Sequence, residues 1–397
     1  MGRCTGTVAR GIRTPIVRKG DAVEEMVVES VLKAAEAEGF TIQDRDVVGI
    51  TESLLARAQG NYASVDAIAA DLKAKFGGDS LGVVFPILSR NRYAVLLRAM
   101  ARSARQVVLL LSYPSDEVGN QLMDHDRMEE EGVNPWTDHL TEDRFREVCG
   151  DSVHPFTGVD YVHYYRSLVE EEGAACTVLF SNHPQTILAH TGKVLACDIH
   201  TRERTKRLLR AAGAEIVYGL DEVLSSPVDG SGYHPEYGLL GSNKATEESV
   251  KLFPLDCQSV VDRIQQLLRE KTGKLVEVMV YGDGAFKDPV GKIWELADPV
   301  VSPAYTAGLE GTPNEVKIKY LADNHFAGLD GDKLQEAVAQ QIREKKGDLT
   351  GAMEAQGTTP RRLTDLIGSL CDLVSGSGDK GTPVVYIQGY FDSFASE

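Results

Sequence analysis

The segment 47–60 reads Val47-Val48-Gly49-Ile50-Thr51-Glu52-Ser53-Leu54-Leu55-Ala56-Arg57-Ala58-Gln59-Gly60. Its first four residues form a short apolar run, which predicts a buried strand. Two hydroxyls, a carboxylate, an arginine and a glutamine follow directly. Ligand-binding groups at the end of a buried strand are the usual arrangement in α/β proteins. A plain strand-to-helix connection with a solvated charged face would give the same pattern, so chemistry alone leaves the two interpretations even.

Strand and helix patterns continue on both sides of this segment. In the middle of the chain, apolar strands alternate with helices, which predicts a parallel, Rossmann-like sheet. The predicted strands there are Val107–Leu111, Thr177–Phe180, Val194–Cys197 and Glu215–Tyr218, and the predicted helices are Arg92–Ser103, Val159–Glu172 and Arg202–Ala212. The two outer parts read as α+β, with helices at Val23–Glu38, Ala63–Phe76, Ser259–Arg269, Leu334–Lys346 and Arg361–Val374 and strands at Val276–Tyr281 and Val384–Ile387. The expected fold class is therefore α/β (α+β).

Length and charge limit the functions to consider. A chain of 397 residues is long enough for two or three domains. A formal net charge of −17 repels nucleic acid and anionic membranes, so we expect neither as a partner. No apolar run approaches the ~18 residues that cross a bilayer, and Met1 to Arg18 has no apolar signal core. Six scattered cysteines without a CxxC pair indicate reduced thiols, and we expect a cytoplasmic protein.

Two further loops carry groups suited to phosphate chemistry. Gly11 to Ile16 is a turn with Arg13 and Thr14, and such side chains beside exposed N–H groups hold phosphate. Asp283 follows a predicted strand between two glycines, where a carboxylate can hold Mg²⁺ or Mn²⁺ against phosphate oxygens. Each segment also fits an ordinary turn.

Two nucleotide-binding motifs are excluded. Gly376-Ser377-Gly378-Asp379-Lys380-Gly381 fits GxGxxG, but a predicted helix precedes it and a predicted strand follows. A dinucleotide fingerprint needs the opposite order, so we interpret this segment as a loop. The sequence also contains no GxxxxGK[ST] P-loop, so any nucleotide binds in another way.

Five blocks in one order carry a family resemblance. They are Gly11–Pro15, Thr51–Gly60, Gly241–Asn243 with Val250–Pro254, Tyr281–Phe286, and Arg362–Ile367 with Gly381–Val385. Together they resemble the coenzyme F420-0:L-glutamate (gamma-glutamyl) ligase family. The resemblance covers about Gly2 to Leu81 and Tyr237 to Tyr390, and between them only Pro86 to Arg90 has a clear counterpart. It implies a discontinuous gamma-glutamyl-ligase-like core, 1–81 and 237–397, with an inserted Rossmann-like α/β domain at 82–236.

The resemblance assigns roles to individual positions. With the chemistry of these segments, it places six residues at the nucleotide: Arg13, Thr14, Glu52, Ser53, Arg57 and Asn243. Arg57 stands where the family has a lysine, and Asp283 matches a metal-binding aspartate. Leu240 stands where a second metal-binding aspartate is expected, and Gly284 where a threonine helps hold the metal. Leucine does not ligate a hard cation, so Glu236 or Asp288 would have to supply the missing oxygen. The resemblance assigns no catalytic residue.

The implied activity joins L-glutamate, or a similar amino acid, to a carboxylate of a small molecule. GTP phosphorylates the carboxylate, and the amine then attacks the acyl phosphate, with Mg²⁺ or Mn²⁺ and often K⁺ present. The family resemblance also implies a homodimer. Because Leu240 and Gly284 remove metal ligands, a catalytically silent homologue that senses or holds a nucleotide or metabolite is the alternative. A third possibility is a distinct enzyme whose active site lies in the inserted domain.

Overall fold

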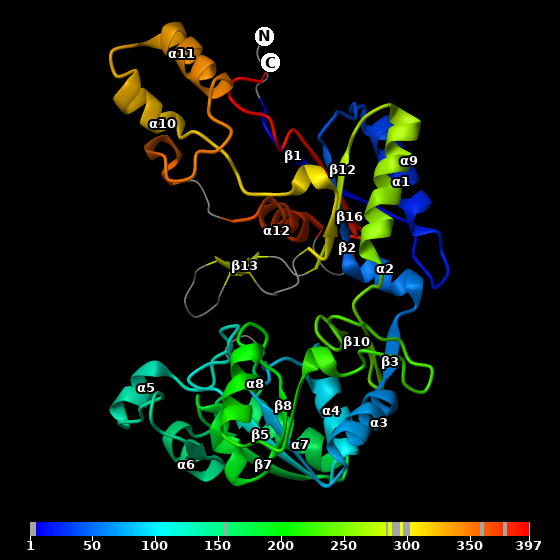
Figure 1. The fold of residues 1–397 in the computed structure, drawn as a ribbon, viewed down its shortest axis with the longest axis vertical. Coiled ribbons are helices and arrows are strands. Elements are labelled where there is room, and N and C mark those ends of the chain that lie inside the picture. Colours follow the sequence, from blue (N-terminus) through cyan, green and yellow to red (C-terminus); the bar gives the residue numbers. More distant parts are fainter. Residues whose placement is uncertain are drawn as a thin grey trace.

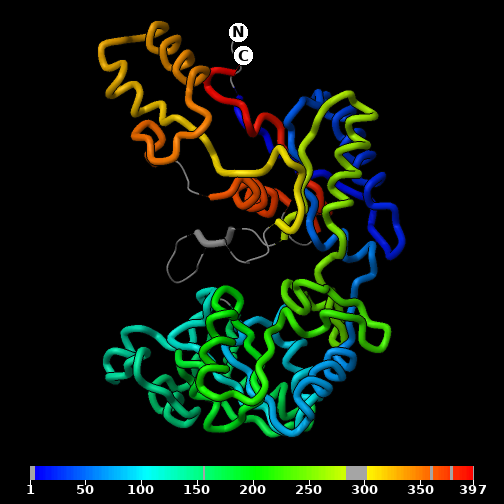
Figure 2. Tube along the Cα trace, viewed as in Figure 1, coloured from blue at the N-terminus to red at the C-terminus, as the bar shows by residue number. Residues whose placement is uncertain are grey.

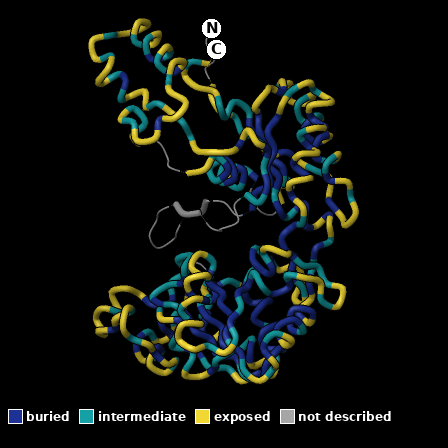
Figure 3. The backbone as a smooth tube through the Cα atoms, viewed as in Figure 1, coloured by how far each residue is buried: buried dark blue, intermediate teal, exposed yellow. Residues whose placement is uncertain are grey.

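The computed structural model describes residues 5–154, 157–282, 302–357, 361–375 and 379–396, together with the backbone of 285–287 and 294–296. These residues form a mixed α/β fold that contains several sheets, of which two are large (Figure 1). Buried segments gather in two separate places, one around each large sheet (Figure 3). Within the described part of the chain, no helix combines the length and apolarity that crossing a membrane requires.

The five-stranded sheet joins the two outer parts of the sequence. Its order is β1 (Val8–Ile12), β16 (Val384–Gln388), β2 (Val47–Thr51), β12 (Glu277–Tyr281) and β15 (Ala304–Tyr305). β2 and β12 are parallel, and the other neighbours pair antiparallel. The first and last strands therefore run side by side, and both chain ends lie near each other (Figure 2).

Nearly continuous runs of buried residues in the central strands let this sheet bury both faces. Val48 and Ile50 point to one face, where helices α1 (Val23–Glu38) and α9 (Cys257–Thr272) cover the sheet. Val47 points to the other face, which α12 (Leu363–Ser375) covers. Because a strand sends successive side chains to opposite faces, five residues of each strand suffice for two hydrophobic layers.

The six-stranded sheet is built in the same way from the middle of the chain. Its order is β6 (Leu140–Thr141), β7 (Ala175–Phe180), β5 (Gln106–Leu111), β4 (Ser80–Val84), β8 (Lys193–Ala196) and β9 (Ile216–Gly219). All neighbours are parallel except β6, which pairs antiparallel with β7. Helices α3 (Val65–Phe76), α4 (Ala94–Ser103) and α7 (Tyr161–Glu171) cover one face, and α8 (Arg202–Ala211) covers the other.

A small three-stranded sheet lies between these two parts (Figure 1). It contains β10 (Asn243–Thr246), β11 (Ser249–Lys251) and β3 (Tyr62–Ser64), with β11 in the middle. The hydrophobic cluster of the six-stranded sheet extends from Ala63 to Leu252 and includes Ala63 of β3 and Val250 of β11. The boundary expected between residues 81 and 82 falls inside β4.

The remaining elements complete the chain. They are α2 (Glu52–Gln59), α5 (His125–Glu130), α6 (Glu142–Cys149), α10 (Ile318–Tyr320), α11 (Gly331–Arg343), the hairpin of β13 (Ala285–Lys287) and β14 (Trp294–Leu296), the 3₁₀ turns Pro184–Ala189, Leu220–Glu222, Ala307–Leu309 and Met353–Ala355, and the π turn Leu321–His325. The helix predicted at Leu334–Lys346 begins and ends three residues earlier. The side chain of Asn314 donates to the carbonyls of Lys346 and Gly347, which holds these residues outside the helix.

Candidate functional site

The parallel strands β2 and β12 end side by side, with Thr51 paired to Tyr281. Glu52 follows one strand and begins α2, and Gly282 follows the other. A Cβ on Gly282 would lie 3.3 Å from Cγ and Cδ of Glu52, so the glycine lets this side chain lie against the backbone. Asp283, Gly284 and Asp288, which carry the predicted metal chemistry, lie outside the described residues.

Glu52 is paired with a lysine that comes from a distant part of the sequence. Glu52 is 8% exposed, and its Oε2 accepts a hydrogen bond of 2.9 Å from Thr51 Oγ1. Lys251 Nζ lies 3.8 Å from Glu52 Oε1 and donates to Ser53 Oγ. Lys251 is itself only 9% exposed. A buried ammonium persists when an opposite charge and a hydrogen-bond acceptor compensate its desolvation, and Glu52 and Ser53 supply both.

The three-stranded sheet positions Lys251. Lys251 ends β11, where it pairs with Tyr62 of β3 on one side and with Asn243 of β10 on the other. Directly opposed residues of antiparallel strands have their Cβ atoms about 5 Å apart. The predicted residue Asn243 is therefore a cross-strand neighbour of the lysine that contacts Glu52 and Ser53. Sequence reasoning missed Lys251, although a single lysine inside the apolar run Val250–Pro254 was a usable signal.

A cavity of about 480 Å³ adjoins these strand ends. Its lining includes three of the predicted nucleotide residues, Thr14, Ser53 and Arg57. Five other lining residues, which were not predicted as site residues, come from α12 and the turn before β16: Asp372, Ser375, Gly381, Thr382 and Pro383. The structure therefore brings together segments from the beginning, the first third and the end of the sequence.

Arg57 is the cation at this cavity. Its Nε donates to the carbonyl of Val17 over 2.6 Å, which fixes the guanidinium beside the loop that carries Thr14. Within the described part of the chain, no hydrogen bond engages its terminal nitrogens. An exposed guanidinium fork in this state suits a phosphate, because the fork binds two oxygens at once.

Arg13 lies in a neighbouring place. It lines a groove of about 960 Å³ between the end of β1 and helix α1, together with Glu25, Glu29 and Lys33. Thr14 lines both this groove and the cavity of Arg57. Arg13 therefore lines a different hollow from Ser53 and Arg57, and Thr14 lies between the two hollows.

The described residues do not by themselves form a divalent-metal site. Glu52 is the carboxylate at the strand ends, and it is already bound to a hydroxyl and an ammonium. Leu240 is 7% exposed and belongs to the hydrophobic cluster of the six-stranded sheet. Glu236 is exposed, and its backbone N–H donates to His234 Nδ1. Across the described ranges, no group of three His, Cys, Asp or Glu side chains is close enough to hold a metal.

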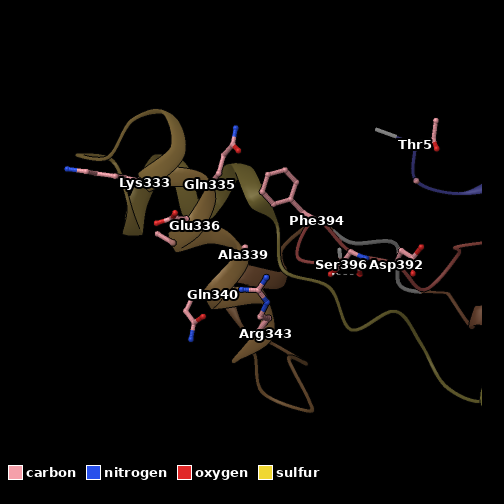
Figure 4. Close-up of a pocket in the computed structure, with 13 residues that line it drawn as sticks. Thr5, Lys333, Gln335, Glu336, Ala339, Gln340, Arg343, Asp392, Phe394 and Ser396 are labelled. Atoms are coloured by element: carbon pink, nitrogen blue, oxygen red, sulfur yellow. Dashed lines mark hydrogen bonds between the residues drawn. The ribbon is translucent and has the colours of Figure 1, made fainter. Parts of the chain in front are cut away.

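A larger hollow lies elsewhere in the molecule. An open hollow of about 1140 Å³ lies between α11 and the C-terminal residues, with Lys333, Glu336, Arg343 and Phe394 in the lining (Figure 4). The lining contains none of the residues predicted from the sequence. Volume alone therefore does not mark the site, and the strand ends are where the predicted residues meet.

Fold and site together define a mixed α/β protein with a buried cation–carboxylate pair at the ends of parallel strands. Residues 11–389 match the model of the F420-0:gamma-glutamyl ligase family. The chain belongs to this family, which confirms the resemblance drawn from the five sequence blocks. The family is one of carbon–nitrogen ligases that use a nucleoside triphosphate and a divalent metal. None of the curated proteins that were compared matches the chain.

Proposed function

We propose that this protein is an NTP-dependent ligase, with GTP as the nucleotide, that joins L-glutamate or a similar amino acid to a carboxylate of a small molecule. The observation that carries the proposal is the Glu52–Lys251–Ser53 cluster at the ends of β2 and β12, beside the cavity of Arg57. Strand ends of this kind are where α/β proteins bind their ligands.

The reaction needs two steps because a free carboxylate has no good leaving group. A carboxylate oxygen of the acceptor attacks the γ-phosphorus, the bond to the β-phosphate oxygen breaks, and the nucleoside diphosphate leaves. The amine of glutamate then attacks the acyl carbon, loses a proton to solvent or a base, and expels inorganic phosphate. Negative charge moves over the phosphate oxygens throughout, so fixed cations beside them lower the barrier.

The described residues suit this task. Arg57 and Thr14 are placed to hold phosphate oxygens in the cavity. Lys251, positioned by Glu52 and Ser53, supplies a second fixed positive charge, and Asn243 lies across the strand from it. Arg13 would contact the nucleotide from the adjoining groove. We also propose, from the family resemblance, that the protein binds Mg²⁺ or Mn²⁺ and K⁺. Asp283 would be one ligand of the divalent ion, and Glu236 or Asp288 would be a second ligand.

An activity assay tests the proposal. The protein is incubated with GTP or ATP, Mn²⁺, glutamate and a panel of carboxylate acceptors, and nucleoside diphosphate and ligated product are measured by mass spectrometry. We expect diphosphate release that depends on an acceptor. Absence of turnover with every acceptor, alongside metal-independent nucleotide binding, would refute the ligase. Asp283→Asn should weaken Mn²⁺ binding, and unchanged Mn²⁺ affinity would show that Asp283 is not a ligand.

One observation favours the second candidate, a catalytically silent homologue that binds a nucleotide or metabolite. Leu240 is packed in the hydrophobic cluster at the position where the family has a metal-binding aspartate. A silent homologue would bind GTP with the same affinity in EDTA as in Mn²⁺ and would release no diphosphate. The same assay therefore separates the two candidates.

The organisation of the chain is also a proposal. We place an inserted Rossmann-like domain between β3 and the end of β11, at about 62–252 instead of 82–236, because one hydrophobic cluster spans these residues. Limited proteolysis should yield a fragment with these ends. The family resemblance supports a cytoplasmic homodimer, and light scattering of the purified protein would measure its mass.

A further inference from the structure

A second cavity lies at the carboxyl ends of the six-stranded sheet. Strands β4, β5 and β8 are adjacent there, and the chain leaves β4 toward β5 and later returns to β8 on the other side. Such a reversal of strand order opens a crevice in parallel sheets, and ligands bind in it. The crevice is bordered by the loop 86–92, which joins β4 to α4. The proposed nucleotide and metal residues do not include any residue of this loop.

The cavity has a polar outer part and an apolar inner part. The outer part, of about 320 Å³, is lined by Ser89, Arg90, Asn91, Asn120 and Tyr161. The inner part, of about 40 Å³, is lined by Tyr93, Leu96, Leu220, Leu239 and Ser242. Ile87, Arg92 and Ile199 line both parts, so the two are continuous.

The inner part contains a polar atom without a partner. Ser242 is 3% exposed, and its Oγ makes no hydrogen bond to the described part of the chain. A buried hydroxyl that makes no hydrogen bond is unfavourable, so natural proteins retain few of them. A ligand atom that reaches the inner part would satisfy Ser242.

The loop 86–92 is held in one conformation before any ligand arrives. Tyr165 Oη donates to the carbonyl of Ile87 over 2.6 Å and accepts the N–H of Ser89 over 2.8 Å. Asp116 accepts the N–H of Leu88 over 2.8 Å, and Ser89 Oγ accepts the N–H of Arg92. The loop ends at the beginning of α4, where the carbonyl of Ser89 accepts the N–H groups of Tyr93 and Ala94.

Charges of both signs surround the outer part, and the acidic groups accept hydrogen bonds from the surrounding loops. Asp116 also accepts the N–H groups of Val118 and Asn120, and Glu117 accepts those of Ile199 and His200. Asp198 Oδ2 accepts the hydroxyls of Thr201 and Thr205, whereas Oδ1 makes no hydrogen bond to the described part of the chain. These carboxylates therefore build the loops around the cavity. Arg90, by contrast, is exposed at its rim.

The cavity is connected to the ligase site through β10. The backbone N–H of Lys244 donates to the carbonyl of Asn91 over 2.7 Å, which ties the loop 86–92 to this strand. Ser242 precedes Asn243, and Asn243 pairs with Lys251, which contacts Glu52 and Ser53. A molecule bound beside Ser242 therefore lies next to the strand that positions Lys251.

We propose that this cavity binds a small molecule with a carboxylate at one end and a short apolar arm tipped by a hydrogen-bonding atom at the other. The carboxylate is held by the side chains of Arg90 and Arg92, and the tip meets Ser242. We further propose that this molecule is the acceptor of the ligase. That role rests on the proposed function, whereas the binding of the molecule to the cavity does not depend on it.

Equilibrium binding without nucleotide or metal tests the proposal. The probes are 4-hydroxyphenylacetate, phenylacetate, which lacks the tip hydroxyl, and phenyl phosphate, which replaces the carboxylate by a phosphate. Calorimetry on the full chain should show saturable binding, tightest for 4-hydroxyphenylacetate. Tighter binding of phenyl phosphate than of both carboxylates would overturn the assignment of a carboxylate.

Variants locate the binding. Ser242→Ala should weaken 4-hydroxyphenylacetate about tenfold, leave phenylacetate unchanged and not lower the Tm of the free protein. Arg90→Gln should weaken both carboxylates about tenfold, whereas Arg105→Gln, an exposed arginine remote from the loop, should change neither. The proposal would be refuted if wild type showed no saturable binding, or if Ser242→Ala and Arg90→Gln bound 4-hydroxyphenylacetate as tightly as wild type does.

The variant Arg57→Gln separates this proposal from the proposed function. It should weaken nucleotide binding and leave the probes bound as in wild type. Probe binding that follows Ser242 and Arg90 in a protein without ligase activity would retain the cavity and refute the ligase. Ligase activity in a protein whose probe binding is unchanged by Ser242→Ala and Arg90→Gln would retain the ligase and refute the cavity.

Discussion

Lys251 Nζ lies 3.8 Å from Glu52 Oε1, although 198 residues separate Lys251 from Ser53, the hydroxyl to which it also donates. Both charged residues are buried. Glu52 directly follows β2 of the five-stranded sheet, and Lys251 ends β11 of the three-stranded sheet. The pair therefore fastens the two parts of the molecule together at the place where we expect the phosphates.

Replacing Lys251 tests this relationship. Lys251→Met should lower the free energy of unfolding by about 3 kcal/mol, because it leaves Glu52 buried without its counter-charge. It should also reduce kcat by about 100-fold, as expected when a fixed positive group beside the reacting phosphate is removed. Urea unfolding and diphosphate release measure the two effects.

The double variant Glu52→Gln/Lys251→Met distinguishes stability from catalysis. It should recover much of the lost stability, because no isolated charge remains, but none of the activity. Lys244→Met is the matched control on the same hairpin, because Lys244 pairs with the exposed Glu247. This substitution should lower the free energy of unfolding by less than about 1 kcal/mol. Equal effects of Lys244→Met and Lys251→Met would contradict the assignment.

Arg57 offers a prediction on nucleotide affinity. Arg57→Gln should raise the Kd for GTP about tenfold, which corresponds to about 1.4 kcal/mol. Arg57→Lys should retain most of the affinity, because a charge remains although the fork does not. Arg269→Gln, in the exposed last turn of α9, serves as the control. If fluorescence titration gives the same Kd for wild type and Arg57→Gln, the cavity at the strand ends is not the nucleotide site.

Local patterns in the sequence predicted the elements but not their long-range contacts. The helix predicted at Val23–Glu38 has these bounds in the structure, and the strand Val47–Ile50 needed only one more residue. Both have strong apolar periodicity, which is a local property. The strand β4 was not predicted, since Gly82 interrupts a short run; Ile187 and Thr191 pack where its side chain would be.

The same limit applies to the site. Thr14, Ser53 and Arg57 were found because ligands gather at strand ends, which is a rule of the fold class. Lys251 was missed because its role depends on a partner about 200 residues away, which no local pattern encodes. Asp372 and Thr382 were missed for a related reason: their segments meet the cavity only because β16 pairs between β1 and β2.

Tyr386, in β16, provides a prediction on the stability of the five-stranded sheet. Its hydroxyl donates to Asp46, a carboxylate that is 2% exposed and also accepts the N–H groups of Gln43 and Gly389. Burial, and then this hydrogen bond, raise the pKa of Tyr386 well above its ordinary value. Tyr386→Phe removes one donor from a buried carboxylate and should lower the free energy of unfolding by about 2 kcal/mol.

The control is a tyrosine that donates to an exposed carboxylate. Tyr305 donates to Glu310 over 2.6 Å at the surface, so Tyr305→Phe should change the stability by less than about 0.5 kcal/mol. Urea unfolding followed by far-UV circular dichroism measures both variants. A smaller effect at Tyr386 than at Tyr305 would show that Asp46 finds a replacement donor.

Glu172 predicts how stability depends on pH. Its carboxylate accepts hydrogen bonds of 2.6 Å from Nε of both Arg98 and Arg102. The hydrogen bond from Arg102 lowers the pKa of Glu172 below its ordinary value, with Arg98 adding to this effect against the opposing effect of burial. A folded-state pKa below the unfolded one means that Glu172 stabilises the protein above the unfolded pKa, and that this stabilisation is lost as pH falls through the folded pKa.

As the pH falls through the ordinary glutamate pKa and below it, the free energy of unfolding should therefore fall less steeply in Glu172→Gln than in wild type, while the variant is less stable by about 2 kcal/mol at pH 7. The difference between the two proteins should shrink as the pH is lowered, because protonated Glu172 and glutamine are both neutral. Glu129→Gln, on the exposed face of α5, should keep the wild-type slope. Urea unfolding at half-unit pH intervals gives these slopes, and a wild-type slope in Glu172→Gln would mean that the two arginines do not hold the carboxylate in its charged form.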